Sequence, residues 1–246
     1  MRQTSKVAIA AVSIAVLVAS PALAGAKLQS EVLGNTIQLN RNCSGTIIHS
    51  DRDDKTGDVS TYVLTAKHCV DGAGAKDMVI DVPVYQDNRM VKRISYVGKV
   101  DRVSWSSDLA LIKLIDDQTF FESAAAVAGD DVDVAMGDAV VVAGYPAGMG
   151  LTLTRGDFVA LETMDWPSKG TDYYRATAPI MGGSSGGALY HVEPGGKYEL
   201  IGVVTGGLNG APFMGLYTPA PDIYDFLKYA LPEAVGAVKP VYTATK

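Results

Sequence analysis

The stretch that most constrains the fold is Gly182-Gly183-Ser184-Ser185-Gly186-Gly187-Ala188-Leu189, a serine pair in a glycine-rich turn that leads into an apolar run. Glycine adopts backbone angles that other residues avoid, so this turn can be sharp. A sharp turn lets the backbone N–H groups of Gly183 and Ser185 point at one spot. The sequence therefore predicts a tight turn that presents the Ser185 hydroxyl at the start of a strand.

Two earlier stretches place reactive side chains beside predicted strands. Leu64-Thr65-Ala66-Lys67-His68-Cys69 ends one strand, and Ser107-Asp108-Leu109-Ala110-Leu111-Ile112 puts an acid at the head of another. A serine hydroxyl attacks poorly at neutral pH unless an imidazole takes its proton and a carboxylate fixes the imidazole tautomer. Attack on an acyl carbon also builds negative charge on oxygen, which preorganised N–H groups stabilise. The three stretches together supply these groups.

Strand signals dominate the rest of the chain. A polar loop spans 50–60, and an Ala- and Asp-rich connector spans 116–138. Many short strands separated by turns predict an all-β barrel or sandwich. The predicted strands are 46–48, 62–65, 78–85, 91–100, 109–115, 139–143, 151–154, 158–163, 173–176, 187–190, 198–205 and 213–217.

One helix is predicted near the end of the chain. Its apolar residues follow the helical period, Asp222 can cap its start, and Pro232 ends it. The periodic apolar residues are Ile223, Phe226, Leu227, Ala230 and Leu231.

Composition bounds the class of protein. The chain has 246 residues, of which 48% are hydrophobic and 20% charged, enough apolar content for a core. The formal net charge is −6, and no dense basic run is present, which argues against a nucleic-acid partner.

The first 24 residues predict a secretory signal peptide. Segment 1–24 begins with two basic residues, continues with the apolar run 7–19, and ends with Ala22-Leu23-Ala24. The 13 apolar residues span about 20 Å as a helix, against about 30 Å for a hydrocarbon core. We therefore expect cleavage after Ala24 or Ala26, export to the periplasm or the extracellular space, and no membrane association afterwards. The mature net charge is then −6 − 2 = −8.

Only two cysteines are present, Cys43 and Cys69. An exported chain meets an oxidising compartment, so a single bridge is the leading interpretation; two free thiols or half a metal site are the alternatives. Zinc needs further ligands, and the chain has three histidines, His49, His68 and His191. We expect no metal. A bridge would constrain the unfolded chain by about 3.5 kcal/mol.

The three reactive stretches resemble those of the chymotrypsin-like serine proteases, in the chain order His, Asp, Ser. His68 matches the general base of that family, Asp108 its carboxylate and Ser185 its nucleophile. The resemblance also implies a disulfide between Cys43 and Cys69, because the family bridges these two positions. Rival acids near Asp108 do not directly precede an apolar Leu-Ala-Leu run; they are Asp101, Asp116 and Asp117.

The resemblance runs over 33–229 and implies the fold. We expect two six-stranded antiparallel β-barrels, with the active site in the cleft between them and a C-terminal helix. The expected protease domain is 25–246, with barrel one at about 30–120, barrel two at about 136–220 and the helix at about 222–231.

Within that superfamily the second half resembles the bacterial Do-type and glutamyl-endopeptidase branch. The resemblance rests on Val142-Ala143-Gly144-Tyr145-Pro146, on Thr154-Arg155-Gly156, and on the strands at 187–189 and 200–203. We expect no PDZ peptide-binding domain, so the chaperone-like or cage-forming behaviour of Do-type proteases is not carried over.

Two positions depart from the trypsin pattern. Ser184 stands where trypsin-type enzymes have the aspartate that pairs with a new N-terminus after zymogen cleavage, so that switch cannot operate here. The second departure is the specificity pocket, where the resemblance aligns only uncharged residues and puts Val204 in place of the histidine of glutamyl endopeptidases. These pocket residues are Pro179, Thr205, Gly206 and Gly207. We expect the pocket to take an uncharged side chain.

The resemblance implies a serine endopeptidase that acts through an acyl-enzyme. Ser185 attacks, His68 accepts and returns a proton, Asp108 orients His68, and the amides of Gly183 and Ser185 form the oxyanion hole. We expect protein or peptide substrates, no cofactor and a monomer. The alternatives are an esterase and an exported non-catalytic binding protein on the same fold. An α/β-hydrolase would need an acid and a histidine after the serine; only His191 follows, with no acid between.

Overall fold

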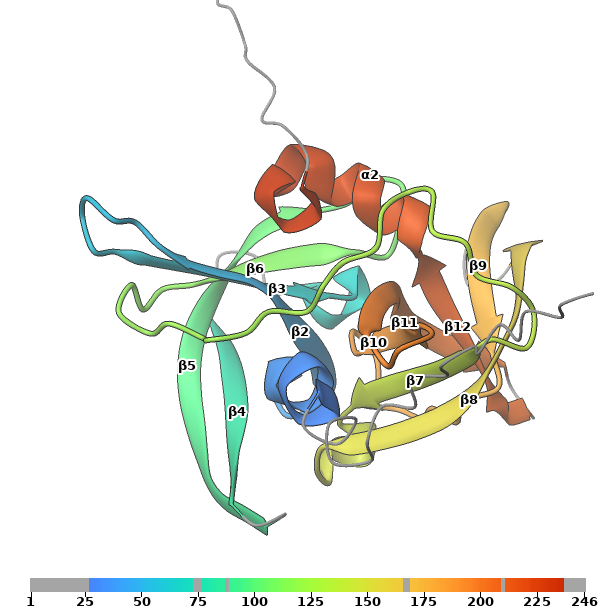
Figure 1. The fold of residues 1–246 in the computed structure, drawn as a ribbon, viewed down its shortest axis with the longest axis horizontal. Helices are drawn as coiled ribbons and strands as arrows, with labels where there is room; N and C mark the ends of the chain where they lie inside the picture. The colour runs from blue at the N-terminus through green and yellow to red at the C-terminus, as the bar shows by residue number, and fades with distance from the viewer. Residues whose placement is uncertain (1–26, 73–76, 87–88, 166–168, 209–210, 237–246) are drawn as a thin grey trace, which may run out of the picture.

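The computed structural model describes residues 27–72, 77–86, 89–165, 169–208 and 211–236 (Figure 1). The predicted signal peptide, 1–24, lies outside the described residues. The described strands form two closed six-stranded barrels with antiparallel pairing throughout, which confirms the predicted fold class.

The first barrel has the strand order β1-β2-β3-β6-β5-β4. Antiparallel neighbours joined by short turns need no crossover helix, which suits a chain with this many closely spaced strands. Its strands are β1 (Thr36–Leu39), β2 (Cys43–Arg52), β3 (Val59–Thr65), β4 (Met78–Gln86), β5 (Arg89–Val103) and β6 (Ala110–Leu114).

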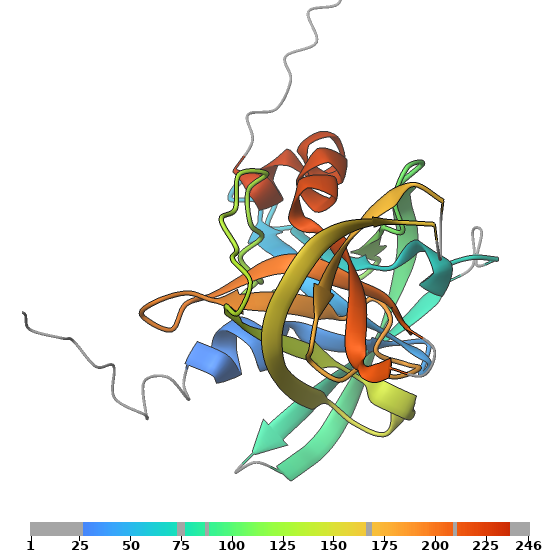
Figure 2. The same cartoon turned by 90° about the vertical axis from the view of Figure 1, so that its right-hand side faces the viewer.

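The second barrel has the order β10-β11-β12-β9-β8-β7 and faces the viewer in Figure 2. Its strands are β7 (Ala139–Gly144), β8 (Thr152–Met164), β9 (Thr171–Ala176), β10 (Ala188–Val192), β11 (Tyr198–Leu208) and β12 (Ala211–Pro219). Short 3-10 or π turns accompany the strands: η1 (Leu28–Val32), η2 (Leu33–Asn35), η3 (Lys67–Cys69), η4 (Pro146–Gly148) and η5 (Pro232–Val235).

Several strands are apolar on both faces because each face packs into a different core. On β3, Val63 joins the interior of the first barrel, whereas Leu64 joins a core between the barrels. On β10, Leu189 joins the interior of the second barrel, whereas Tyr190 joins the core between the barrels. Strands buried on both faces read as continuous apolar runs.

The helix α2 (Ala220–Ala230) lies over the junction of the barrels (Figure 1). Ile223 and Leu227 are fully buried and belong to the core between the barrels. The helix begins two residues before the predicted cap: Pro219 is its N-cap residue, and no side chain caps it. Asp222 lies in the first turn instead, because an extended proline already sets the start of the helix.

The strand predictions were wrong at two places: one strand was missed, and one predicted break is absent. The four residues of β1 were missed because the strand is too short to show a pattern and is buried throughout. The predicted break between 154 and 158 is absent, since β8 runs on through Gly156. Glycine is needed there for packing: a Cβ would lie 2.3 Å from the Ala178 nitrogen. That glycine marks a close approach rather than a turn.

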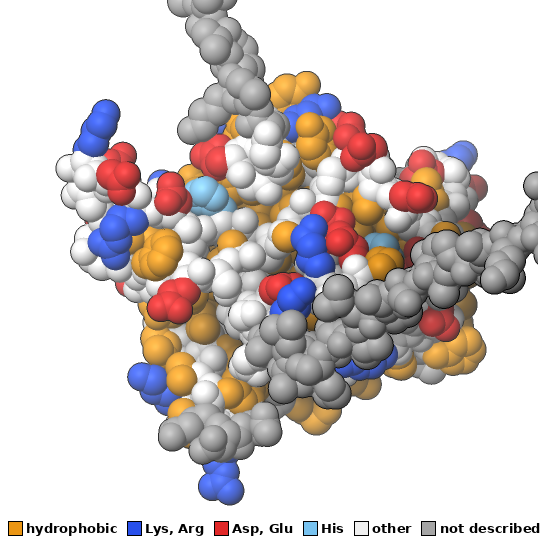
Figure 3. Space-filling view, in the orientation of Figure 1, with side chains coloured by type: hydrophobic (Ala, Val, Ile, Leu, Met, Phe, Trp, Pro, Cys, Tyr) orange, Lys and Arg blue, Asp and Glu red, His pale blue; other side chains and the backbone are white. Residues whose placement is uncertain are grey.

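Among the described residues, no helix combines the length and apolarity that a bilayer crossing requires. Basic side chains lie scattered among acidic ones on the face shown in Figure 3.

The predicted bridge between Cys43 and Cys69 is confirmed, with an S–S distance of 2.01 Å. It ties the first residue of β2 to the end of η3, directly after His68.

Replacing both cysteines by alanine should lower the free energy of unfolding by about 3.5 kcal/mol, because the unfolded chain regains the freedom of a 26-residue loop. Denaturant unfolding of the variant and of wild type, with and without a reductant, measures the loss. Reduction should destabilise only the wild type. A loss below about 1 kcal/mol would mean that the bridge adds little to stability.

Candidate active site

The pairing of β3 with β6 brings His68 and Asp108 together. Thr65 lies opposite Ala110 in an antiparallel register, so the chain leaving β3 meets the chain entering β6 at the same edge of the barrel. His68 comes three residues after Thr65, within η3, and Asp108 two residues before Ala110. Positions 40 residues apart are thereby placed in contact.

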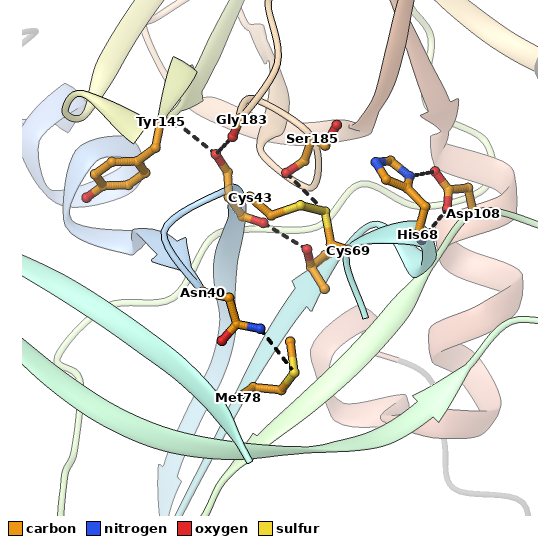
Figure 4. Close-up of a disulfide and its surroundings, with 11 residues drawn as sticks. Asn40, Cys43, His68, Cys69, Met78, Asp108, Tyr145, Gly183 and Ser185 are labelled. Atoms are coloured by element: carbon orange, nitrogen blue, oxygen red, sulfur yellow. Dashed lines mark hydrogen bonds and ion pairs between the residues drawn. A yellow bond between two sulfur atoms is a disulfide. The ribbon is translucent and has the colours of Figure 1, made fainter. Parts of the chain in front are cut away.

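Both carboxylate oxygens of Asp108 bind His68. Oδ2 lies 2.7 Å from the imidazole Nδ1, and Oδ1 accepts the backbone N–H of His68 at 2.9 Å (Figure 4). Two bonds to one residue fix the position of the chain and the rotation of the ring. Nδ1 is occupied, so the opposite nitrogen, Nε2, is the one available to another group.

The pKa of His68 is raised above its ordinary value of 6.5. The main cause is the hydrogen bond to Asp108, and the charges of Asp108 and Asp71 act in the same direction. Desolvation by burial opposes the shift without cancelling it. The imidazolium form is therefore stabilised, as a base that accepts a proton during a reaction requires.

The rival acids lie elsewhere. Asp101 is exposed on β5, and Asp116 accepts hydrogen bonds from the turn that follows it. The two other histidines are also apart from this pair: His49 contacts the ring of Tyr62, and His191 lies 3.5 Å from Asp138.

The Ser185 loop docks onto the disulfide that follows His68. The Ser185 carbonyl accepts the N–H of Ser44 at 2.7 Å and lies 3.6 Å from the Cys69 sulfur. Cys69 is the neighbour of His68, so Ser185 from the second barrel comes beside the imidazole from the first (Figure 4).

No hydrogen bond links the Ser185 hydroxyl to His68 among the described residues, and both Oγ and Nε2 are without a partner. Such bonds are often long in a free enzyme and shorten when substrate binds. The arrangement leaves both the hydroxyl and the basic nitrogen available.

Hydrogen bonds to the preceding carbonyls orient two backbone N–H groups of this loop. The Gly182 carbonyl accepts the Ala147 N–H at 2.6 Å, and the Ser184 carbonyl accepts the Gly187 N–H at 2.9 Å. In a trans peptide the N–H points opposite to the carbonyl, so the N–H groups of Gly183 and Ser185 point away from these partners. Neither has a hydrogen-bond partner within the described ranges.

Gly183 must be glycine for this geometry. Its φ is +95°, which side chains disfavour. A Cβ at this position would also lie 2.5 Å from the Tyr145 carbonyl oxygen.

A cleft of about 410 Å³ opens beside the His68–Asp108 pair. Thr205 and Gly206, two of the predicted pocket residues, line it, whereas Pro179 and Gly207 do not. Trp105 also lines the cleft and is 96% exposed. The full lining is Lys67, His68, Trp105, Ser106, Ser107, Asp108, Thr171, Tyr173, Thr205 and Gly206.

The sequence did not indicate four residues that shape this region. Ile180 lies against Gly207, where a methyl group would be 3.6 Å from Ile180 Cδ1. Ser44, Tyr145 and Ala147 bond to the Ser185 loop or to each other. Tyr145 stands in a stretch quoted above, but its contact with Ser44 crosses between the barrels.

Comparisons with known proteins identify the family of the chain. The family model of the trypsin-like peptidase domain matches residues 43–203. A probable periplasmic serine protease do/HhoA-like of Haemophilus influenzae is 33% identical over 164 residues, covering 66% of this chain and 30% of the relative. The periplasmic serine endoprotease DegP of Escherichia coli K12 is 32% identical, over 66% of this chain and 29% of that protein. The chain thus spans about a third of the length of these relatives.

Solved structures show the same fold. A variant of the HtrA-type protease AlgW with a tripeptide has a TM-score of 0.62 and 22% identity, covering 82% of this chain and 62% of that chain. An inactive form of Rv3671c from M. tuberculosis H37Rv has a TM-score of 0.58 and 21% identity, covering 93% of this chain and 100% of that one.

Two substitutions should lower the pKa of His68, as measured by NMR titration of the imidazole. Asp108→Asn removes the largest stabilising contact of the imidazolium and should give the larger decrease; Asp71→Asn removes a more distant charge and should give a smaller one. Asp101→Asn serves as the control and should leave the titration unchanged. A pKa in Asp108→Asn equal to that of wild type would contradict the assignment of the raised pKa to this pair.

Proposed function

The chain belongs to the trypsin-like peptidase family, and from that premise we propose that it is an exported serine endopeptidase. One observation carries the proposal. A hydrogen-bonded imidazole–carboxylate pair lies beside a serine whose own N–H, like that of Gly183, has no partner among the described residues. These are the groups that acyl transfer to a hydroxyl requires.

The first half of the proposed reaction forms an acyl-enzyme. Ser185 Oγ attacks the carbonyl carbon of the scissile bond while His68 Nε2 takes its proton. Asp108 holds the ring and stabilises the imidazolium. The carbonyl oxygen becomes an oxyanion and accepts the N–H groups of Gly183 and Ser185. The intermediate collapses when His68 gives its proton to the leaving amine.

The second half repeats these roles with water. A water molecule attacks the acyl carbon as His68 takes one of its protons. Collapse of the second oxyanion returns this proton to Ser185 Oγ and releases the carboxylic acid. Every proton that moves has a donor and an acceptor among His68, Ser185, the substrate and the attacking water, so the cycle closes.

We extend the proposal to specificity and place the residue before the scissile bond against uncharged groups. Ile180 lies next to Gly207 and is half-buried, and the aligned pocket positions carry no charge. An apolar or small neutral substrate side chain fits such a wall, whereas a charged side chain would lose its hydration without gaining a partner.

Export is supported by the signal-like segment 1–24 and by the Cys43–Cys69 bridge, because disulfides persist in oxidising compartments. The curated relatives named above are described as periplasmic.

A fluorophosphonate probe tests the nucleophile. Wild type should be labelled on Ser185 and should cleave a denatured protein, whereas Ser185→Ala should lose both label and cleavage. Ser184→Ala is the matched control and should keep the label, because the Ser184 side chain is buried. Mass spectrometry locates the label. A folded wild type that is neither labelled nor active would support a binding protein instead.

A peptide library tests the pocket. Cleavage should follow uncharged residues, and Ile180→Ala should raise kcat/KM for large apolar residues relative to small ones by roughly tenfold, because the wall recedes. Leu161→Ala, at an exposed position on β8, is the control and should leave the preference unchanged. Dominant cleavage after Arg, Lys or Glu would overturn the proposed specificity.

A further inference from the structure

Ser44 lies where the two barrels meet behind the Ser185 loop. It is the second residue of β2, comes directly after the bridged Cys43, and is fully buried. Its backbone is held on both sides: its N–H donates to the Ser185 carbonyl at 2.7 Å, and its carbonyl accepts the Thr65 hydroxyl at 2.8 Å. These two bonds therefore fix the backbone position from which the Ser44 side chain extends.

The Ser44 hydroxyl joins two segments of the second barrel. Oγ accepts the N–H of Tyr145 at 2.8 Å and donates its proton to the Gly183 carbonyl, also at 2.8 Å. Figure 4 shows these contacts running between Tyr145 and Gly183. Donor and acceptor are both used and Ser44 is fully buried, so the hydroxyl has one orientation.

These bonds fix both peptide planes that flank Gly183. The preceding plane is held by the Ala147 N–H on the Gly182 carbonyl. The following plane is held by the Ser44 hydroxyl on the Gly183 carbonyl and by the Ser184 N–H on the Met181 carbonyl. With both planes set, the Gly183 N–H can point only one way.

Gly183 itself does not ensure this conformation. Glycine occupies positive and negative φ with similar ease, so the plane before Gly183 could rotate and turn its N–H away once the Gly182 carbonyl left the Ala147 N–H. The neighbouring Ser184 side chain contributes little, because its hydroxyl makes only a 3.4 Å contact with the Met181 N–H. Among the described residues, Ser44 is the one whose side chain bonds to the Gly183 carbonyl.

We propose that Ser44 is a positioning residue that holds the Gly183 N–H in the orientation that receives the oxyanion. Without its hydroxyl, the buried Tyr145 N–H and the partly buried Gly183 carbonyl both lose their partner, and rotation of the loop relieves both. The inference rests on the proposed protease function for its catalytic consequence, but the orientation of the loop can be measured without activity.

The kinetic test uses Ser44→Ala, with enzyme concentration set by active-site titration. Loss of one oxyanion donor costs about a hundredfold to a thousandfold in kcat, so a donor that is only partly misplaced should cost about tenfold to a hundredfold. KM should change little. Affinity for a peptide boronic acid, which mimics the oxyanion, should fall with kcat, while affinity for the product peptide should not. A general structural defect would not separate these two affinities.

Two comparisons isolate the hydroxyl. Ser50→Ala is the matched control, because Ser50 lies on the same strand and its hydroxyl also accepts a backbone N–H, that of Phe121, far from the site. It should keep the wild-type kcat. Ser44→Thr and Ser44→Val add the same bulk but differ in the hydroxyl, so the threonine variant should exceed the valine variant at least tenfold in kcat.

Crystal structures of wild type and Ser44→Ala give a readout that is independent of catalysis. Wild type should show Gly183 near the φ of +95°, and Ser44→Ala should show the preceding peptide rotated. An unrotated peptide with wild-type kcat and boronic acid affinity would overturn the inference. An inactive wild type with a rotated loop in Ser44→Ala would overturn the protease proposal and keep the positioning role. An inactive wild type with an unrotated loop would overturn both.

Discussion

One backbone hydrogen bond, from the Ser44 N–H to the Ser185 carbonyl, sets where the second barrel presents its hydroxyl to the first. It lies next to the Cys43–Cys69 bridge, and Cys69 follows His68. Ser185 and His68 are therefore both held in place by this hydrogen bond and the disulfide next to it. A shift of either barrel would break this bond before it separated the two side chains. The geometry of the site therefore depends on the docking of the two barrels.

The packing makes that constraint rigid. The strands that carry the site are buried on both faces, one face in a barrel interior and the other in the core between the barrels. Interiors at this density resist displacement, because any sliding of one layer opens voids in another. His68 lies three residues beyond the end of β3 and Ser185 three residues before the start of β10, so each is anchored close to such a strand.

The chemistry of the loop behind Ser185 follows from burial. Ser184 is 4% exposed, and an aspartate at that place would need a cationic partner, since an unpaired buried charge costs several kcal/mol. Neutral hydroxyl and amide groups are used here instead. They satisfy one another locally through Ser44, Tyr145 and Gly183, and they do not depend on a new chain terminus.

The sequence alone determined the fold class and the bridge. The spacing of apolar runs, the two cysteines and the family resemblance suffice for these, because strand period and turn chemistry are local properties. The His68–Asp108 contact could also be anticipated, from two strand ends with matching motifs. The short strand β1 shows too little pattern to be predicted, and the start of α2 is set by the extended Pro219 before the periodic residues begin. The continuation of β8 through Gly156 could not be anticipated, because Ala178, remote in sequence, decided it. The same holds for Ile180 against Gly207 and for Ser44 between Tyr145 and Gly183. A serine in the sequence does not show which groups its hydroxyl will bond to. Only the tertiary structure decides which N–H and which carbonyl lie within reach of that hydroxyl.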